Sequence, residues 1–232
     1  MKIKEAIVLA GGLGTRLRSV VKDVPKPMAD VNGKPFLEYI LDYLLNSELE
    51  KVILSVGYKY EVILKYFGEK YKDLVLIYSI EDEPLGTGGA IKKSLSFVND
   101  KDILILNGDT FFKIDFFKFL EFHKSKKADL SIALKPMKNF DRYGTVEIDS
   151  NYRIIGFKEK TYKKFGLING GVYLLKTEVF KEINFPEKFS FEKEFLEKFY
   201  ENLHFFGLPF DNYFIDIGIP EDYERAKRDF GN

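Results

Sequence analysis

The sequence predicts an α/β protein with a Rossmann-like, three-layer α/β/α fold around a mostly parallel, mixed sheet. Over residues 1–135, short apolar runs alternate with runs of helical periodicity, which is the pattern of successive βαβ units. Beyond residue 135, strand-like runs follow one another without long helices between them, so we expect an antiparallel addition to the same sheet. No low-complexity linker or repeat divides the 232 residues. We therefore predict a single domain over residues 1–232.

The first half of the chain supplies the expected parallel strands and their connecting helices. Strands are predicted where apolar residues form short continuous runs, at residues 6–10, 51–57, 74–80, 102–106 and 129–135. Leu37, Ile40, Leu41 and Leu44 recur at helical spacing and predict an amphipathic helix near residues 36–46. Further helices are predicted near residues 62–67, 87–98 and 115–126.

The second half of the chain is richer in strands. Strands are predicted at residues 144–149, 153–158 and 169–175. Helices return near residues 190–201 and 220–229, and Pro220-Glu221 makes a favourable first turn for the last of them.

The composition excludes several classes of protein. Lys+Arg and Asp+Glu both number 36, so the formal net charge is zero, which argues against nucleic-acid or anionic-membrane partners. The absence of cysteine excludes disulfides and thiolate metal sites. The apolar run after the N-terminus, of about six residues, is too short for a secretory or membrane segment. These features predict a soluble, cytoplasmic protein. The two histidines, His123 and His204, are interpreted as incidental rather than as ligands.

The first chemical motif is GGLGTRL, residues 11–17, directly after the first predicted strand. Glycines there let the backbone approach a phosphate and direct N–H groups at it, and Arg16 adds a fork of donors for phosphate oxygens. Leu17 occupies the place of the third glycine of the dinucleotide fingerprint, which opposes an NAD-dependent oxidoreductase. The only Gly-Lys pair is followed by proline, so no Walker A loop is present. We favour phosphate binding over a plain glycine-rich turn.

Three further residues are candidates for chemistry. Lys26 lies between two prolines that restrict its backbone, yet this tetrapeptide by itself favours a solvated loop lysine. Asp109 follows the apolar strand at 102–106, where a turn or helix N-cap role competes evenly with a ligand role. Asp216 lies between two isoleucines, where an unpaired carboxylate is expensive to bury. For Asp216 we favour a metal ligand over a turn residue.

Taken together and in order, these segments resemble the sugar-1-phosphate nucleotidyltransferase family. GGLGTRL is followed by PKPM at residues 25–28 and by Asn107-Gly108-Asp109 after a buried strand. Later segments extend the resemblance over nearly the whole chain: EPLGTGGA at 83–90, YGTV at 143–146, FKEK at 157–160, INGGVY at 168–173 and DIGIPEDY at 216–223.

The resemblance implies an enzyme that joins a nucleoside triphosphate to a sugar 1-phosphate and releases pyrophosphate and an NDP-sugar. Such chemistry needs no nucleophilic side chain, because it depends on holding two polyanions in line. The implied catalytic residues are Arg16, Lys26 and Asp109. The implied nucleotide-binding residues are Leu9, Ala10, Gly11, Gly12, Gly14, Thr15, Arg16, Gly86, Thr87 and Asp109.

The resemblance also implies a metal site and a sugar side. Mg²⁺ is the implied cofactor, with Asp109 and Asp216 as its ligands. The implied sugar-binding residues are Gly144, Glu159, Lys160 and Asn169, with Lys160 reaching the sugar phosphate. Glu159 and Lys160 lie in a charged stretch, residues 158–164, that is also typical of a solvated edge.

Base and sugar are predicted from the segment at residues 85–90. LGTGGA is similar to the segment of mannose- and heptose-type guanylyltransferases, whereas thymidylyltransferases usually carry a glutamine after the equivalent Gly-Leu. This favours GTP with D-glycero-α-D-manno-heptose 1-phosphate or mannose 1-phosphate. An N-acetylmuramate 1-phosphate uridylyltransferase is the alternative within the family. A nucleotide-sugar-binding regulatory paralogue is the non-enzyme alternative, disfavoured because Arg16, Lys26, Asp109 and Asp216 are all present. Monomer and homodimer both stay open.

Overall fold

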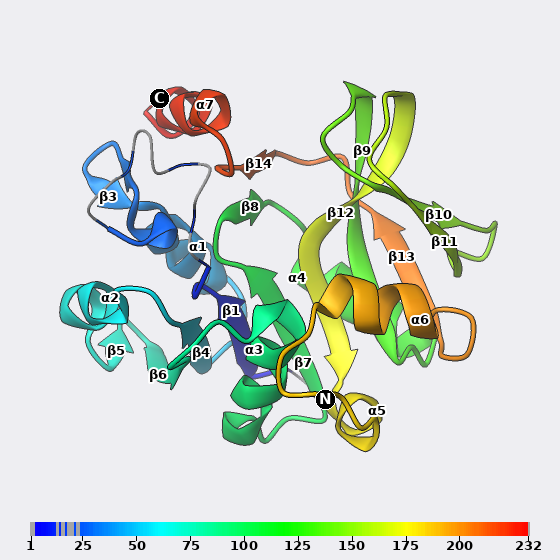
Figure 1. Cartoon of the computed structure of the whole chain (residues 1–232), viewed down its shortest axis with the longest axis horizontal. Helices are drawn as coiled ribbons and strands as arrows, with labels where there is room; N and C mark the ends of the chain where they lie inside the picture. The colour runs from blue at the N-terminus through cyan, green and yellow to red at the C-terminus, as the bar shows by residue number, and fades with distance from the viewer. Residues whose placement is uncertain (1–2, 13, 15–16, 18–20, 22–23, 232) are drawn as a thin grey trace.

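The computed structural model describes residues 3–12, 14, 17, 21 and 24–231, and a mixed ten-stranded sheet forms its centre (Figure 1). Hydrogen-bonded neighbours follow the order β11-β10-β12-β7-β1-β4-β6-β5, and β9 pairs with both β12 and β13. The parallel half comprises β1 (Glu5–Leu9), β4 (Lys51–Val56), β6 (Leu74–Ile80) and β7 (Asp102–Asn107). The predicted α/β class with a mostly parallel, mixed sheet is therefore confirmed.

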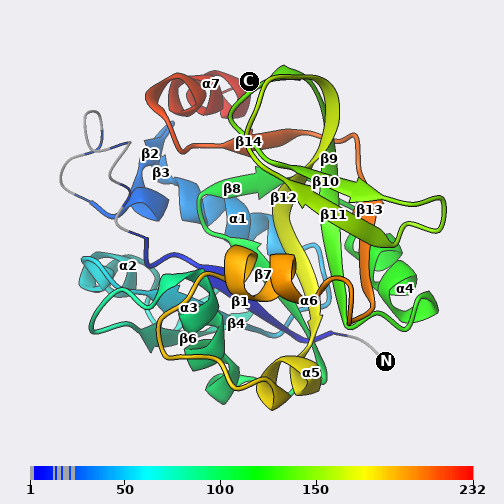
Figure 2. The same cartoon turned by 45° about the vertical axis from the view of Figure 1, so that its right-hand side comes forward.

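The antiparallel half begins at β12 (Lys163–Lys176), which runs antiparallel to β7. The other strands of this half are β9 (Leu130–Phe140), β10 (Thr145–Ile148), β11 (Ile154–Lys158) and β13 (Phe205–Pro209). All pairings within this half are antiparallel except that of β13, which runs parallel to β9. An isolated bridge joins Arg153 to Phe206, so the chain entering β11 lies beside β13 and this half curls back on itself (Figure 2). The expected antiparallel addition to the same sheet is confirmed.

Helices cover both faces of the sheet. One hydrophobic cluster includes side chains from α1 (Phe36–Leu44), α2 (Tyr60–Phe67), α4 (Phe116–Ser125) and α7 (Pro220–Phe230). The other includes side chains from α3 (Gly86–Ser94), α5 (Thr177–Glu182) and a π-helical turn at Phe191–Leu196. Two separate clusters on either side of one sheet are the three-layer arrangement that the sequence predicts.

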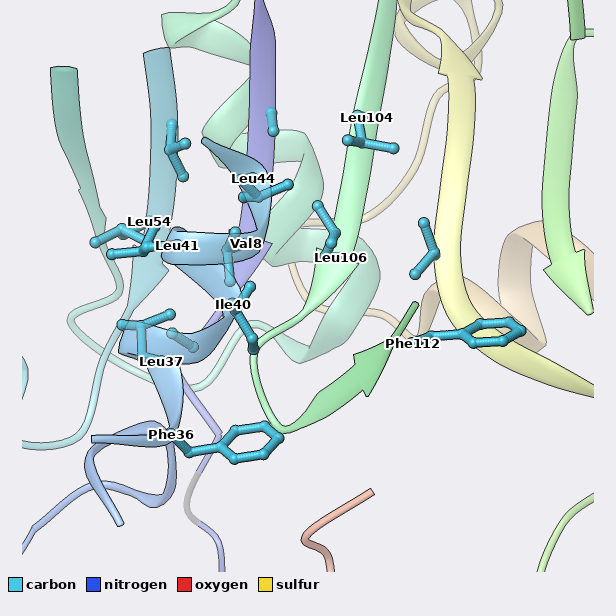
Figure 3. Close-up of a cluster of buried hydrophobic side chains, with 14 of the residues drawn as sticks. Val8, Phe36, Leu37, Ile40, Leu41, Leu44, Leu54, Leu104, Leu106 and Phe112 are labelled. Atoms are coloured by element: carbon cyan, nitrogen blue, oxygen red, sulfur yellow. The ribbon is translucent and has the colours of Figure 1, made fainter. Parts of the chain in front are cut away.

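Side-chain alternation along the central strands produces the two clusters. Val8 and Leu54 belong to the cluster under α1, whereas Ile7 and Ile53, one residue earlier on each strand, belong to the opposite cluster. Successive strand residues point to opposite faces, so a fully apolar strand contributes side chains to both hydrophobic clusters. Figure 3 shows the apolar residues of α1 directed at Val8, Leu54, Leu104 and Leu106.

Several elements differ from the sequence prediction. The predicted helix near 190–201 opens as the π-helical turn and continues as α6 (Glu197–Phe199), and the helix at 87–98 divides into α3 and η3 (Leu95–Phe97). Strands β8 (Thr110–Phe112) and β14 (Phe214–Asp216) and helix α5 are not predicted, because each is too short to show a period. Strand β13 is not predicted either. The remaining short elements are η2 (Lys26–Met28), β2 (Asp30–Val31), β3 (Lys34–Pro35) and β5 (Lys70–Tyr71).

Among the described residues, no helix combines the length and the apolar character that crossing a membrane requires.

Candidate active site

A cavity of about 360 Å³ opens at the carboxyl ends of β1 and β7. Open α/β sheets place ligands at this end of their strands. Most of the residues implied for nucleotide binding line it: Leu9, Ala10, Gly11, Gly12, Gly14, Gly86, Thr87 and Asp109, together with Lys26. Thr15 and Arg16, the other two, lie outside the described residues. The fold therefore gathers into one cavity implied residues that are up to 100 positions apart in the chain.

At two glycines of the first loop, neighbouring atoms leave little room for a Cβ. A Cβ on Gly11 would lie 2.7 Å from Glu81 Oε1, and a Cβ on Gly14 would lie 2.9 Å from the Cβ of Lys26. Gly14 also has a φ of 58°, a left-handed conformation that other residues rarely adopt. At these glycines the loop backbone lies directly against the walls of the cavity, and glycine-rich loops of this kind are typical of phosphate sites.

Lys26 joins the two candidate metal ligands. Its Nζ lies 2.6 Å from Asp109 Oδ2 and 3.8 Å from Asp216 Oδ1, and only 10% of its side chain is exposed. The expectation of a solvated lysine, drawn from the tetrapeptide alone, is therefore wrong. Pro25 and Pro27 fix the short helical turn η2 around it, and partners more than 80 residues away decide where the ammonium group lies.

A small two-stranded ladder brings Asp109 and Asp216 together. β8 follows Asp109 directly and pairs antiparallel with β14, whose last residue is Asp216. The Ile217 N–H donates to the Asp109 carbonyl oxygen at 3.0 Å, which closes the ladder beside both carboxylates. Because a strand follows Asp109, its alternative role as a helix N-cap is wrong.

Burial raises the pKa of Asp216, and the neighbouring Asp109 carboxylate raises it further, against the opposing effect of Lys26. The Gly218 N–H donates to Asp216 Oδ1 at 2.8 Å, so this aspartate also makes the local turn that the sequence left open. A cation would relieve the repulsion between the two carboxylates.

Asp109 and Asp216 fit a divalent cation. Carboxylate oxygens are the ligands that hard cations prefer. Within the described part of the chain, no cluster of three or more His, Asp or Glu side chains is arranged to hold a metal ion. Metal ions at phosphate-handling sites usually have one or two protein carboxylates as ligands, and water and phosphate oxygens occupy the remaining coordination positions.

The other end of the cavity carries hydrogen-bonding groups that the sequence analysis missed. Glu81 follows β6, and its carboxylate accepts from the Ser55 hydroxyl at 3.1 Å and from the Leu85 N–H at 3.0 Å. Ser55, Glu81 and Asn107 all line the cavity. Each polar side chain stands at or next to the carboxyl end of a predicted strand, and that position is the signal that could have found them.

The implied sugar-side residues lie in the antiparallel half. Thr145 pairs with Lys158 on β11 and with Ile168 on β12. Gly144, Glu159 and Asn169 are the residues next to these three in the chain. A Cβ on Gly144 would lie 2.6 Å from the Lys158 carbonyl oxygen, so glycine is needed there. Three of these residues therefore share one region of the sheet edge.

Asn169 connects this region to the cavity. Its side chain donates to the Tyr173 hydroxyl at 2.9 Å and accepts from the Gly171 N–H at 3.0 Å. Gly171 in turn packs against Asn107 of the cavity wall.

The structure does not bring Lys160 to the cavity. Glu159 and Lys160 are both exposed in the loop between β11 and β12, and neither lines the cavity. Their placement is that of a solvated edge, one of the two interpretations that the sequence left open.

Tyr143 and Arg142 form a contact to Asp216 that the sequence analysis missed. The Tyr143 hydroxyl donates to Asp216 Oδ2 at 3.4 Å, and Arg142 Nη2 donates to the same hydroxyl at 3.3 Å. Burial raises the pKa of Tyr143 well above its ordinary value, so the phenol stays a neutral donor. Arg142 Nη1 also lies 2.7 Å from Asp222 near the start of α7.

Comparisons with known proteins agree with this geometry. A D-glycero-alpha-D-manno-heptose 1-phosphate guanylyltransferase from Aneurinibacillus thermoaerophilus is 54% identical over 225 residues, with 97% of each chain covered. The enzyme of the same name from Campylobacter jejuni subsp. jejuni serotype O:2 is 55% identical, over 94% of this chain and 96% of that protein. The solved structure of HddC from Yersinia pseudotuberculosis complexed with GMP-PN matches with a TM-score of 0.88 and 39% identity, covering 98% and 100% of the two chains.

The family model described as nucleotidyl transferase matches residues 5–232, which is nearly all of the sequence. Enzymes of this family generally use a divalent metal ion, in agreement with the two carboxylates beside Lys26. The cavity, the glycine loop and the carboxylate pair all lie within the matched range. This chain therefore belongs to the nucleotidyl transferase family.

Proposed function

We propose that this enzyme transfers the guanylyl group of GTP to D-glycero-α-D-manno-heptose 1-phosphate, giving GDP-heptose and pyrophosphate. One observation carries the proposal: a single cavity joins a hydrogen-bonding end at Glu81 to an end where Lys26 lies between two carboxylates. The names of the two relatives that are 54% and 55% identical support the choice of base and sugar.

In this reaction an oxygen of the sugar phosphate attacks the α-phosphorus of GTP. A phosphorus–oxygen bond forms to the sugar phosphate, the bond to the bridging oxygen breaks, and pyrophosphate leaves with that electron pair. Catalysis then consists of alignment and charge stabilisation. Lys26, held by Asp109, presents a fixed cation toward the phosphates, and removal of such a group typically lowers the rate about 10²–10³-fold.

Asp109 and Asp216 would hold the divalent ion, and we propose Mg²⁺ as that ion. When bound, a divalent ion supplies positive charge to phosphate oxygens. Lys26 keeps the two carboxylates within reach of a common point. Tyr143 holds the second oxygen of Asp216 in place.

Glu81 supports guanine over uracil. The Watson–Crick edge of guanine offers two neighbouring donors, N1–H and N2–H₂, and a carboxylate accepts such a pair. Among the described residues, each oxygen of Glu81 accepts one hydrogen bond, which leaves lone pairs for a base. Uracil offers one N–H between two carbonyl oxygens, and those oxygens would face the negative charge.

On the sugar side we propose Gly144, Glu159 and Asn169 as contacts, with Lys160 reaching the sugar phosphate when substrate binds. We also propose that residues 1–232 act as one domain, and that the protein works in the cytoplasm without nucleic-acid or membrane partners.

The test is pyrophosphate release from four nucleoside triphosphates, each paired with heptose, mannose, glucose and N-acetylmuramate 1-phosphates. We expect the highest kcat/KM for GTP with the heptose phosphate. We also expect the isosteric Glu81→Gln variant to lose at least about tenfold in kcat/KM for GTP, because the amide offers one acceptor in place of two. A preference for UTP with N-acetylmuramate 1-phosphate would overturn the proposal.

A further inference from the structure

The glycine-rich segment 85–89 of the cavity wall packs against residues 187–189, about 100 positions later in the chain. The Gly88 N–H donates to the Phe189 carbonyl oxygen at 3.0 Å, and the Phe189 N–H donates to the Leu85 carbonyl oxygen at 2.9 Å. A Cβ on Gly86 would lie 2.5 Å from Phe189 O, and one on Gly89 would lie 2.3 Å from Glu187 O. These glycines are therefore needed for contact with residues 187–189 as well as for any contact with a nucleotide.

Thr87 makes the only side-chain hydrogen bonds that the described residues show between this segment and the π-helical turn. Its hydroxyl donates to Glu192 Oε2 at 2.7 Å and accepts from the Phe191 N–H at 2.9 Å. The hydroxyl proton is thus used within the protein and is not available to a base. Although Thr87 lines the cavity, its side chain serves to attach the wall to the turn behind it.

Glu192 is held in place from its own side as well. The Ser190 hydroxyl donates to the same Oε2 at 2.9 Å, and Ser190 caps the turn by accepting from the Lys193 N–H at 3.2 Å. The turn is π-helical from Phe191 to Leu196, a rare form that recurs at functional sites. Phe191 and Phe195 of the turn are buried in the core, and their packing fixes the backbone that carries Glu192.

We propose that Glu192 is a positioning residue of the nucleotide site. It holds Thr87, and through Thr87 it keeps the cavity wall at residues 86–89 in the conformation that receives the nucleotide. This inference rests on the proposed function only in that the cavity binds a nucleoside triphosphate. It does not depend on which base or sugar is used.

The experiment measures steady-state kinetics of the full-length enzyme with the nucleoside triphosphate that the wild type uses fastest. We expect Glu192→Ala to raise the nucleotide KM about tenfold, as loss of one charge-assisted hydrogen bond predicts, with the sugar-phosphate KM changed much less. Glu192→Gln keeps an oxygen that can accept from both hydroxyls, and we expect it to restore most of the nucleotide affinity.

Glu194→Ala is the matched control. Glu194 belongs to the same turn and accepts from the Ser190 N–H at 2.8 Å. It therefore shares the local structural role of Glu192 without the contact to Thr87. We expect similar losses in melting temperature from both alanine variants, but a raised nucleotide KM from Glu192→Ala alone.

Thr87→Val tests the partner and covers the case in which Glu192→Ala does not fold. It removes the hydroxyl and keeps the side-chain shape, so we expect the same tenfold rise in nucleotide KM. An unchanged nucleotide KM in Glu192→Ala or in Thr87→Val, beside normal wild-type turnover, would overturn the inference and leave the proposed function standing. A wild-type enzyme that releases pyrophosphate from no nucleoside triphosphate would overturn both.

Discussion

The parallel and antiparallel halves of the sheet build their parts of the site in different ways. In the parallel half, residues that line the cavity lie at or just after the carboxyl ends of β1, β4, β6 and β7, so these strands bring their side chains to the same edge. In the antiparallel half, the implied sugar-side residues lie at the ends and in the loops of β10, β11 and β12. β10 runs antiparallel to both β11 and β12, so position along the chain does not say which edge a residue on these strands reaches.

The difference shows in how enclosed the two sets of residues are. Lys26 is 10% exposed and paired with Asp109, whereas Glu159 and Lys160 are exposed. Charges in an enclosed site act more strongly than charges in water. The end of the cavity at Lys26 is therefore organised before any substrate arrives, whereas the exposed residues proposed for the sugar would depend more on the substrate itself.

The largest effect is expected at the enclosed end. Asp109→Ala should lower kcat by at least about 10²–10³-fold, because it removes the partner of Lys26 and one of the two carboxylates proposed to hold the divalent ion. The far-UV circular dichroism spectrum should be unchanged. Asp211→Ala, an exposed aspartate on the antiparallel half, is the control and should keep wild-type activity. Near-wild-type turnover of Asp109→Ala with Mg²⁺ supplied would remove this residue from the mechanism.

Gly86→Ala tests the close contact between the cavity wall of the parallel half and the Phe189 carbonyl group. Gly86 has a φ of 74°, and an added Cβ would also meet the Phe189 carbonyl oxygen. We expect the free energy of unfolding to fall by about 1–3 kcal/mol in chemical denaturation and kcat/KM for the nucleotide to fall with it. Gly33→Ala has a φ of 81° but meets no atom within 4 Å, so it isolates backbone strain. Equal losses in the two variants would show that contact with Phe189 adds nothing.

On the antiparallel half, Lys160→Ala should act on one substrate only. If Lys160 reaches the sugar phosphate, the KM for that substrate should rise about tenfold, as loss of one charge-assisted contact predicts, with the nucleotide KM unchanged. Lys164→Ala, in the same charged stretch, is the control. Identical kinetics in the two variants would leave Lys160 as part of a solvated edge.

The smallest effect concerns the far end of β7, where a carboxylate has a structural role. Asp102 lies 3.6 Å from the buried His123 imidazole, and this contact holds the pKa of Asp102 below its ordinary value of 3.8. A lowered pKa contributes stability above the unfolded-state pKa, and that stability disappears as pH falls through the folded-state pKa. Asp102→Asn should therefore lower the free energy of unfolding by about 1 kcal/mol at pH 7.

In urea titrations, the difference between wild type and Asp102→Asn should shrink as pH falls below about 4. Asp211→Asn, whose aspartate is 83% exposed, should have a smaller effect at every pH. A gap between Asp102→Asn and wild type that does not vary with pH would assign the effect to packing rather than to charge.

Much of the site could be predicted because its motifs follow predicted strands. Gly11, Asp109 and Gly86 were expected in one nucleotide site, and all three line the same cavity. The functions of Lys26 and Glu192 could not be predicted from local sequence, since their partners lie 83 and 105 residues away. Thr87 was expected to contact nucleotide, but only the structure reveals that its hydroxyl is committed to Glu192.

By itself the sequence determined the fold class, the order of the main strands and helices and the chemical type of the loops, because these depend on local periodicity and residue identity. Tertiary structure alone decided that Lys26 is enclosed, that β8 and β14 pair to bring Asp109 beside Asp216, and that a π-helical turn supports the cavity wall. Those features consist of contacts between distant segments, and their geometry is set by how the layers pack rather than by any one segment.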